Sequence, residues 1–254
     1  MISKNTIKLV KSLAYKKYRE KEQLFVAEGD KIVTEIMNSG IHIEQLYATR
    51  EFLDLHTTTN NPFISSIGEI KKQEIERASL LKNPQNCLAI CKLPQPKLLP
   101  SAVSGISIYL DGIQDPGNLG SIIRICDWFA IDHLFCSTDT ADMYNPRVIQ
   151  ATMGSFCRVR AQKASNADIA TLINNSKLTV YGAMLDGDSI YSESFSFPAM
   201  LIIGNEGNGI RNDMSALVNK KLTIPSFRKG AESLNAAMAT AILCSEFRRG
   251  SYSK

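Results

Sequence analysis

The stretch LDGIQDPGNLGSIIRICDWFAID, residues 110–132, joins the end of an apolar strand to an apolar helix through a polar turn. Residues 115–120 of this turn, DPGNLG, hold only two glycines, Gly117 and Gly120. Their spacing matches neither the GxGxxG of a dinucleotide-binding fold nor the GK[ST] of a phosphate loop. Both standard nucleotide cradles are therefore disfavoured, and the turn needs another explanation.

Arg124 is the unexpected residue of this segment. The helix is expected to begin near Asn118 and is otherwise apolar, yet a guanidinium does not readily lose its charge. Two simple explanations stay open at this point. Arg124 can extend to solvent or to a surface carboxylate along its aliphatic stem, and Asn118 can serve only as a helix cap.

The flanking sequence alternates apolar strands with amphipathic helices. This pattern predicts an α/β fold with a mostly parallel sheet that is covered on both faces. Ligands of such sheets bind in the loops at the carboxyl ends of the strands. The segments are ISIYLDGI, NLGSIIRICDWFA, HLFCST, LTVYGAML, AMLIIGNE, KLTIPS and LNAAMATAILCSEFRR.

Two further loops have the composition of a ligand site. In LIIGNEGNGIRND, three glycines permit positive φ and close backbone approach, and Glu206 either binds a basic partner or stabilises the turn. In IPSFRKGAESLNAAMATA, Ser233 and Asn235 lie at a helix start, where free N–H groups favour ligand contacts. Three such loops at strand ends of one sheet predict a single pocket.

The N-terminal part predicts a smaller α/β module. Apolar spacing predicts a helix over residues 5–18, followed by a strand LFVAEG, a helix DKIVTEIMNSG and a strand IHIEQLYAT. A proline-rich linker at residues 93–104 separates the two parts. We therefore expect an N-terminal domain at residues 1–97 and a second domain at residues 105–254.

The charge and the cysteines of the chain indicate which cell compartment and which partners to expect. The 254 residues carry a net charge of +4, with a local excess of basic residues in the first 31 positions. That excess would favour a polyanion, but from charge alone a solvated helix face is the more common explanation. Six cysteines in apolar surroundings suit reduced thiols, and we find no leader or membrane-spanning pattern, so a cytoplasmic protein without membrane contact is expected. The scattered histidines and cysteines predict no metal site.

The three loops together resemble a known family. NxGxxxR at residues 118–124, IIGNEGNG at 202–209 and IPxxxxxxSLNAAMA at 224–239 resemble the motifs of the SpoU family, TrmH-like RNA ribose 2'-O-methyltransferases of the SPOUT superfamily. The segment KKYREKEQLFVAEGDKIVTEIMNSG resembles their L30e-like substrate-binding domain. The resemblance implies a C-terminal trefoil-knotted domain, a rare exception to unknotted chains.

The resemblance also implies roles for individual residues. Those expected to bind S-adenosylmethionine are Ala183, Leu185, Ile203, Gly204, Asn205, Gly207, Gly209, Ile224, Pro225, Ser233, Leu234 and Asn235. Those expected in catalysis are Arg124, Asn118, Glu206, Ser233 and Asn235, and those expected to bind RNA are Lys16, Lys17 and Arg19.

The implied reaction is methyl transfer to a ribose 2'-hydroxyl, whose proton must leave during the transfer. The resemblance implies that Arg124 orients and activates this hydroxyl and that either Arg124 or a substrate phosphate removes the proton. Ribosomal RNA is favoured over transfer RNA as the substrate because of the extra N-terminal domain, and a homodimer through the knot region is expected. The alternatives are the same chemistry on transfer RNA and a knotted RNA-binding protein without catalysis.

Overall fold

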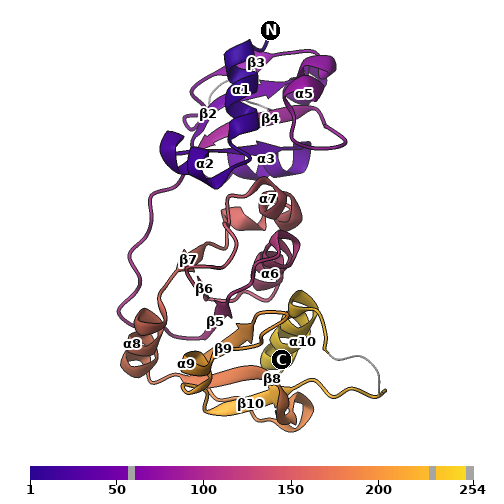
Figure 1. Cartoon of the computed structure of the whole chain (residues 1–254). Helices are drawn as coiled ribbons and strands as arrows, with labels where there is room; N and C mark the ends of the chain where they lie inside the picture. Colours follow the sequence, from indigo (N-terminus) through magenta and orange to yellow (C-terminus); the bar gives the residue numbers. More distant parts are fainter. Residues whose placement is uncertain (57–60, 229–232, 250–254) are drawn as a thin grey trace. The chain divides into compact units, whose positions relative to one another are not determined.

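The chain folds into two compact units (Figure 1). The computed structural model describes residues 1–56, 61–228 and 233–249. The first unit contains Met1–Gln95 together with Asp142–Arg158, and the second contains Pro96–Ala141 with Val159–Lys254. The N-terminal stretch of the first unit therefore ends at Gln95, inside the expected linker. The unit also includes residues 142–158, which belong to the C-terminal part of the sequence.

The first unit is built on a four-stranded sheet in the order β1-β4-β2-β3. Its β1/β4 and β4/β2 pairs are antiparallel, and its β2/β3 pair is parallel. The expected strands and the helix between them are present. The elements are α1 (Lys4–Ser12), α2 (Lys16–Glu22), β1 (Leu24–Glu28), α3 (Asp30–Met37), β2 (Ile43–Ala48), α4 (Arg50–Leu55), β3 (Ile67–Glu69), α5 (Lys72–Ala78), β4 (Cys87–Lys92), α7 (Pro146–Thr152) and the 3-10 turn η1 (Ser155–Cys157).

The prediction of one helix over residues 5–18 is wrong. The helix ends at Ser12 and a second one begins at Lys16. The reason is tertiary: Leu13 is fully buried, and the carbonyls of Leu13 and Ala14 accept hydrogen bonds from the Arg19 guanidinium at 2.8 and 2.9 Å. The spacing of apolar residues alone does not predict that a side chain will bind these carbonyls.

The second unit is an α/β fold, as expected. Its six-stranded sheet has the order β10-β8-β9-β5-β6-β7, and every neighbouring pair is parallel. The elements are β5 (Ile106–Asp111), α6 (Pro116–Trp128), β6 (His133–Cys136), β7 (Ala161–Lys163), α8 (Asn166–Ser176), β8 (Thr179–Ser189), η2 (Ile190–Ser192), β9 (Ala199–Gly204), α9 (Asn212–Ser215), β10 (Lys220–Thr223) and α10 (Ala236–Arg249). The trefoil knot stays a prediction.

Helices cover both faces of this sheet. In Figure 1, α8 and α9 lie on one side and α6 and α10 on the other. One core combines Met200 and Ile202 of β9 with Leu172 of α8 and Met214 of α9. The alternate β9 residues point to the opposite face and are also buried, so the strand is apolar throughout. This explains why AMLIIG lacks the alternation of a half-exposed strand.

The strand order brings two of the predicted loops together. From β5 the chain proceeds to β6 and β7 on one side, whereas β9, β8 and β10 lie on the other side. Asp111 at the end of β5 is paired in register with Gly204 at the end of β9. The loops that follow these strands therefore begin as neighbours at a switch point of the sheet, where α/β proteins bind ligands.

Candidate cofactor and catalytic site

A cavity of about 500 Å³ is lined by the middle of β8, by the ends of β9 and β10 with the loops that follow them, and by α10. This volume falls within the range of small-molecule sites. The predicted cofactor residues that line it are Ala183, Leu185, Ile203, Gly204, Asn205, Gly207, Gly209, Ile224, Ser233 and Leu234. Pro225 and Asn235 are not among the lining residues. Residues 229–232 of the third loop lie outside the described residues.

Several lining residues were not predicted individually. Leu222 from β10 and Ala239 and Leu243 from α10 form part of the wall. Ala236, Ala239 and Leu243 follow helical spacing, so the helix pattern already contained the signal that they share a face. Asp186 and Asn208 add polar groups to the lining. The pocket thus combines an apolar wall with polar loop residues.

The loop after β9 is shaped by a close backbone approach. A Cβ atom on Gly204 would lie 2.2 Å from the carbonyl carbon of Gly209, a distance that no side chain permits. Gly209 itself has a φ of +67°, in the region that favours glycine. Asn205 and Gly209 exchange two backbone hydrogen bonds of 3.0 and 2.9 Å. Together these features close the loop into a tight turn beside the cavity.

Asn205, not Glu206, stabilises this turn with its side chain. Its Oδ1 accepts hydrogen bonds from the amides of Gly207 and Asn208 at 2.9 and 3.2 Å. Its Nδ2 donates to the carbonyl of Gly112 at 2.8 Å, in the loop after β5. Asn205 therefore has the turn-stabilising role that the sequence offers to Glu206, and the Glu206 carboxylate is directed to another partner.

That partner is Asn118, which links the three predicted motifs. Asn118 Nδ2 donates to Glu206 Oε1 at 2.5 Å, and Asn235 Nδ2 donates to Asn118 Oδ1 at 2.8 Å. Asn235 Oδ1 also accepts the amides of Ala237 and Met238 at the start of α10. Side chains 117 residues apart in the sequence therefore form one polar chain, which we call the Asn118 network: Asn118, Glu206 and Asn235.

Asn118 does not cap its helix. The helix α6 begins at Pro116, with Asp115 as the N-cap, and the Asp115 carboxylate accepts the Asn118 amide at 2.7 Å. The expected start near Asn118 is thus two residues late. Proline at the first helical position and Asp before it are a usual helix start, so the signal was present in the sequence. Asn118 is left free to use its side chain in the Asn118 network.

Arg124 stands apart from this network. It lies in the third turn of α6, and its side chain is exposed. It lines no part of the cavity. Within the described residues its guanidinium has no ion pair, so no surface carboxylate neutralises its charge there. An exposed, uncompensated guanidinium on the helix that begins beside the site is suited to bind an anion.

A second polar cluster, missed in the sequence, fixes the loop after β9 to the end of β5. The buried carboxylate of Asp111 accepts the Arg211 amide at 2.8 Å and Arg211 Nε at 2.6 Å. Arg211 also pairs with Asp139, whose carboxylate accepts a hydrogen bond from Ser137 Oγ at 2.6 Å. That bond and the Arg211 charge lower the pKa of Asp139. No local motif marks this pair, because its members are 100 residues apart.

The predicted RNA-binding residues have different positions in the first unit. Lys16 and Lys17 are exposed on α2. Arg19 is only 2% exposed, and its guanidinium binds Asp142 Oδ2 through Nε at 3.0 Å and Nη2 at 2.5 Å. The expectation that Arg19 contacts RNA does not fit this burial. Its donors are used inside the unit, whereas the side chains of Lys16 and Lys17 are exposed.

The chain has clear relatives. The model of the SpoU rRNA Methylase family matches residues 105–245, more than half of the chain, and that of the MRM3-like substrate binding domain matches residues 4–89. The chain belongs to the SpoU rRNA methylase family. The resemblance seen in the three loops is thereby confirmed, as is the class of activity: an RNA methyltransferase that uses S-adenosylmethionine.

Individual SpoU relatives match over nearly the whole chain. The 23S rRNA (guanosine(2553)-2'-O)-methyltransferase RlmP of Bacillus subtilis is 30% identical over 246 residues, 94% of each chain. A TrmH-family protein from Porphyromonas gingivalis has a TM-score of 0.88 at 38% identity and covers 98% of this chain and 99% of its own. An AdoMet-bound rRNA methyltransferase from Sinorhizobium meliloti has a TM-score of 0.85 at 25% identity, over 100% and 97% of the two chains.

Other features of this SpoU protein concern thiols, metals and membranes. The six cysteines form no disulfide, and all but Cys157 are buried. Burial raises the pKa of Cys126, which suits an inert thiol. Among the described residues, no group of three or more His, Cys, Asp and Glu side chains is placed to hold a metal ion. No helix in the described ranges has the length and apolarity needed to cross a membrane.

Proposed function

We propose that this protein methylates a ribose 2'-hydroxyl of ribosomal RNA and holds S-adenosylmethionine in the cavity between β8, β9, β10 and α10. One observation carries the proposal: the Asn118 network connects the first turn of α6, the loop after β9 and the start of α10, and the latter two line the cavity. The rRNA substrate is supported by RlmP, which matches over nearly its full length.

The cavity fits the cofactor in size and in chemistry. Its loop backbone and its apolar wall suit a molecule with a flat aromatic base and a charged amino-acid end. The residues that we propose to hold the cofactor are Ala183, Leu185, Ile203, Gly204, Asn205, Gly207, Gly209, Ile224, Pro225, Ser233, Leu234 and Asn235. S-adenosylmethionine supplies an electrophilic methyl group when it is bound.

The chain's own residues must orient the nucleophile, and its proton needs an acceptor. We assign to Arg124 the binding of a substrate phosphate and the orientation of the hydroxyl, because its guanidinium is exposed on α6. Arginine keeps its proton under ordinary conditions, so removal of the proton by the substrate phosphate is the easier path. Asn118 is assigned to position Arg124 or the ribose, Glu206 to hold the polar network of the site, and Ser233 with Asn235 to contact substrate or cofactor. These residues supply polar contacts that hold the geometry of the reacting groups.

The remaining parts of the proposal concern partners. The N-terminal domain, which the sequence places at residues 1–97, binds the RNA through Lys16 and Lys17. Both side chains are exposed on α2. The protein acts in the cytoplasm as a homodimer formed through the knot region. A stable and active monomer in sedimentation would contradict the homodimer.

Calorimetric titration is the first test of the proposal. The purified protein should bind S-adenosylmethionine and S-adenosylhomocysteine at about micromolar Kd, the range of ordinary cofactor sites. Incubation with ribosomal RNA and labelled S-adenosylmethionine should then place the label on a ribose. Cofactor binding without transfer to any RNA would support a non-catalytic RNA-binding protein instead, and transfer to tRNA alone would replace the rRNA substrate.

Arg124→Ala tests the catalytic assignment. Methyl transfer should fall by at least about 100-fold, the usual effect of removing a group that orients and stabilises the reacting atoms, while Kd for S-adenosylmethionine stays unchanged. Arg124→Lys is the matched variant: it keeps the charge but loses the bidentate geometry and should recover only part of the rate. Substantial transfer by Arg124→Ala would overturn the assignment.

A further inference from the structure

An exposed aromatic side chain lies at the turn between α1 and α2. Tyr15 is the N-cap residue of α2, and 64% of its surface is exposed. Its ring contacts that of Tyr18 edge-on, with the centroids 6.5 Å apart and the planes at 70°. This geometry leaves most of the Tyr15 ring open, so the residue contributes little to the core of the first unit.

Two exposed lysines lie next to Tyr15. Lys16 and Lys17 follow directly in the sequence, and Lys17 Nζ lies 4.9 Å from the Tyr18 ring centroid. Lys16 pairs with Glu20 at 3.5 Å, but both side chains are more than 60% exposed. Such a surface pair contributes little free energy, so Lys16 can exchange Glu20 for a phosphate. Exposed aromatic rings interleaved with lysines are typical of surfaces that bind single-stranded nucleic acids.

The guanidinium of Arg19 fixes the turn between α1 and α2 through hydrogen bonds. Its Nη1 binds the carbonyls of Leu13 and Ala14, the two residues before Tyr15. Its other donors bind Asp142, which opens the internal segment of the first unit. A turn that is fixed before binding costs little entropy to use as a platform. The position of Tyr15 is therefore preorganised.

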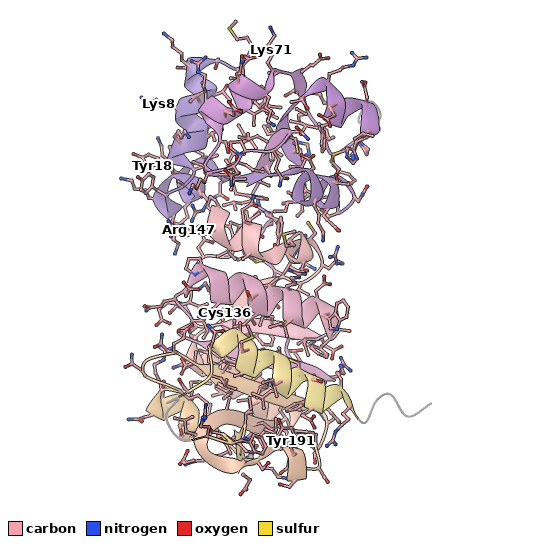
Figure 2. All side chains as sticks on the ribbon, turned by 90° about the vertical axis from the view of Figure 1, so that its right-hand side faces the viewer. Lys8, Tyr18, Lys71, Cys136, Arg147 and Tyr191 are labelled. Atoms are coloured by element: carbon pink, nitrogen blue, oxygen red, sulfur yellow. The ribbon has the colours of Figure 1, made fainter. Side chains whose placement is uncertain are left out.

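The internal segment adds one more cation to the same unit. Arg147 lies in α7, five residues after Asp142, and its side chain is exposed. Figure 2 shows Lys8, Tyr18 and Arg147 along one edge of this unit. We call Tyr15, Lys16, Lys17, Tyr18 and Arg147 the turn surface.

We propose that the turn surface binds unpaired nucleotides of the RNA substrate, with one base stacked on the ring of Tyr15 and phosphates bound by Lys16, Lys17 and Arg147. The inference rests on the proposed function and makes it more specific, because it names the form of RNA that the first unit recognises. Bases in a duplex have both faces stacked, whereas bases in loops and single strands offer a free face to an aromatic ring. The surface should therefore discriminate against duplex RNA.

Fluorescence anisotropy on the full-length protein tests this proposal. The probes are a labelled single-stranded RNA of mixed sequence, about 12 nucleotides long, and the same strand annealed to its complement. The wild-type protein should prefer the single strand. Tyr15→Ala should weaken single-strand binding by about 5- to 100-fold, the loss expected for one stacked base, and Tyr15→Phe should retain it. Lys17→Gln should lower the dependence of log Kd on log salt by about one.

Tyr191→Ala serves as the matched control. Tyr191 is also an exposed tyrosine, at 48%, but it lies in η2 of the second unit and is expected to leave RNA affinity unchanged. Circular dichroism of each variant checks that it is folded. Equal binding of single strand and duplex by the wild type, or wild-type affinity in a folded Tyr15→Ala, would overturn the proposal. The second result would leave the turn surface to a protein partner.

Methyl transfer separates this inference from the proposed function. With ribosomal RNA as substrate, Tyr15→Ala should raise KM for RNA. It should leave kcat at saturating RNA unchanged, because Tyr15 is not one of the residues assigned to the cofactor or to catalysis. Transfer by the wild type with no effect of Tyr15→Ala on KM or affinity would refute the turn surface alone. Tyr15-dependent RNA binding without any methyl transfer would refute the proposed function alone.

Discussion

Burial decides what Arg19 does. The residue belongs to a run of basic side chains, but its guanidinium is enclosed by Asp142 and two carbonyls. Removal of one partner of a buried ion pair leaves the other without compensation. We expect Arg19→Gln to lower the free energy of unfolding by about 3–5 kcal/mol, measured by urea denaturation followed by circular dichroism.

Lys17→Gln, on the same helix, is the control for Arg19→Gln. Lys17 is exposed, so its replacement should change the free energy of unfolding by no more than about 0.5 kcal/mol. Equal effects of the two substitutions would show that Arg19 is no more important to the fold than a surface lysine.

Glu28 makes the stability of the first unit depend on pH. Its side chain is 3% exposed, and burial raises the pKa of its carboxyl although Ser79 and the Leu80 amide donate to it. Since the folded pKa lies above the unfolded one, the folded state binds the proton more tightly. Protonated Glu28 therefore contributes stability that is fully present at pH values below its pKa in the unfolded state. This stability is lost as pH rises through its pKa in the folded state.

Glu28→Gln removes this titration. We expect the stability of the wild type relative to Glu28→Gln to decrease as pH rises from about 4 to about 8. Urea denaturation of both proteins across this range measures the difference. A difference that is constant with pH, or one that rises, would contradict the raised pKa.

The loop after β9 depends on glycine at one position and tolerates a side chain at another. A Cβ at Gly204 would overlap the backbone of Gly209, whereas a Cβ at Gly207 would lie 3.5 Å from Asn205 Oδ1, an ordinary contact. Gly204→Ala should therefore open the Asn205–Gly209 turn and weaken S-adenosylmethionine binding by at least about tenfold, because about 1.4 kcal/mol of strain suffices. Calorimetric titration measures both variants.

Gly207→Ala is the matched control for backbone strain: because Gly207 lines the cavity, its Kd is read beside its free energy of unfolding, which should stay within about 0.5 kcal/mol of the wild type. Unchanged binding by Gly204→Ala would mean that the turn does not shape the cofactor cavity. The same turn is fixed to β5 by Arg211 and Asp111, so the cavity depends on contacts between elements as well as on its glycines.

The first unit is completed by a segment from the C-terminal part of the chain. Phe25 on β1 is fully buried and packs against Tyr144 and Phe156, with ring centroids 5.0 and 6.1 Å away. Gln150 Nε2 also donates to the carbonyl of Glu28 at 2.7 Å. A fragment of residues 1–95 would expose Phe25 and lose the partner of Arg19. We expect its Tm to lie at least about 10 °C below that of the completed unit.

The completed unit is a fragment of residues 1–95 joined by a flexible glycine and serine linker to residues 142–158. Thermal unfolding of the two fragments by circular dichroism makes the comparison. Equal Tm values would mean that residues 142–158 contribute nothing to the unit, and that residues 1–95 form an independent domain.

The sequence by itself determined the family, the α/β class and the loops that line the cavity. These properties depend on local signals: glycines and polar residues at strand ends, and the period of apolar residues in each element. Gly204, Gly209 and Asn235 could be singled out because a turn or a helix start restricts the residue at its own position.

Only the tertiary structure decided which partner each polar side chain finds. Arg19 belongs to the interior, Asn118 bridges Glu206 and Asn235, and Arg211 binds Asp111, all through contacts between residues far apart in the sequence. The break between α1 and α2 and the transfer of residues 142–158 to the first unit have the same origin. Hydrogen bonds and burial are properties of pairs brought together by the fold, and no local pattern specifies them.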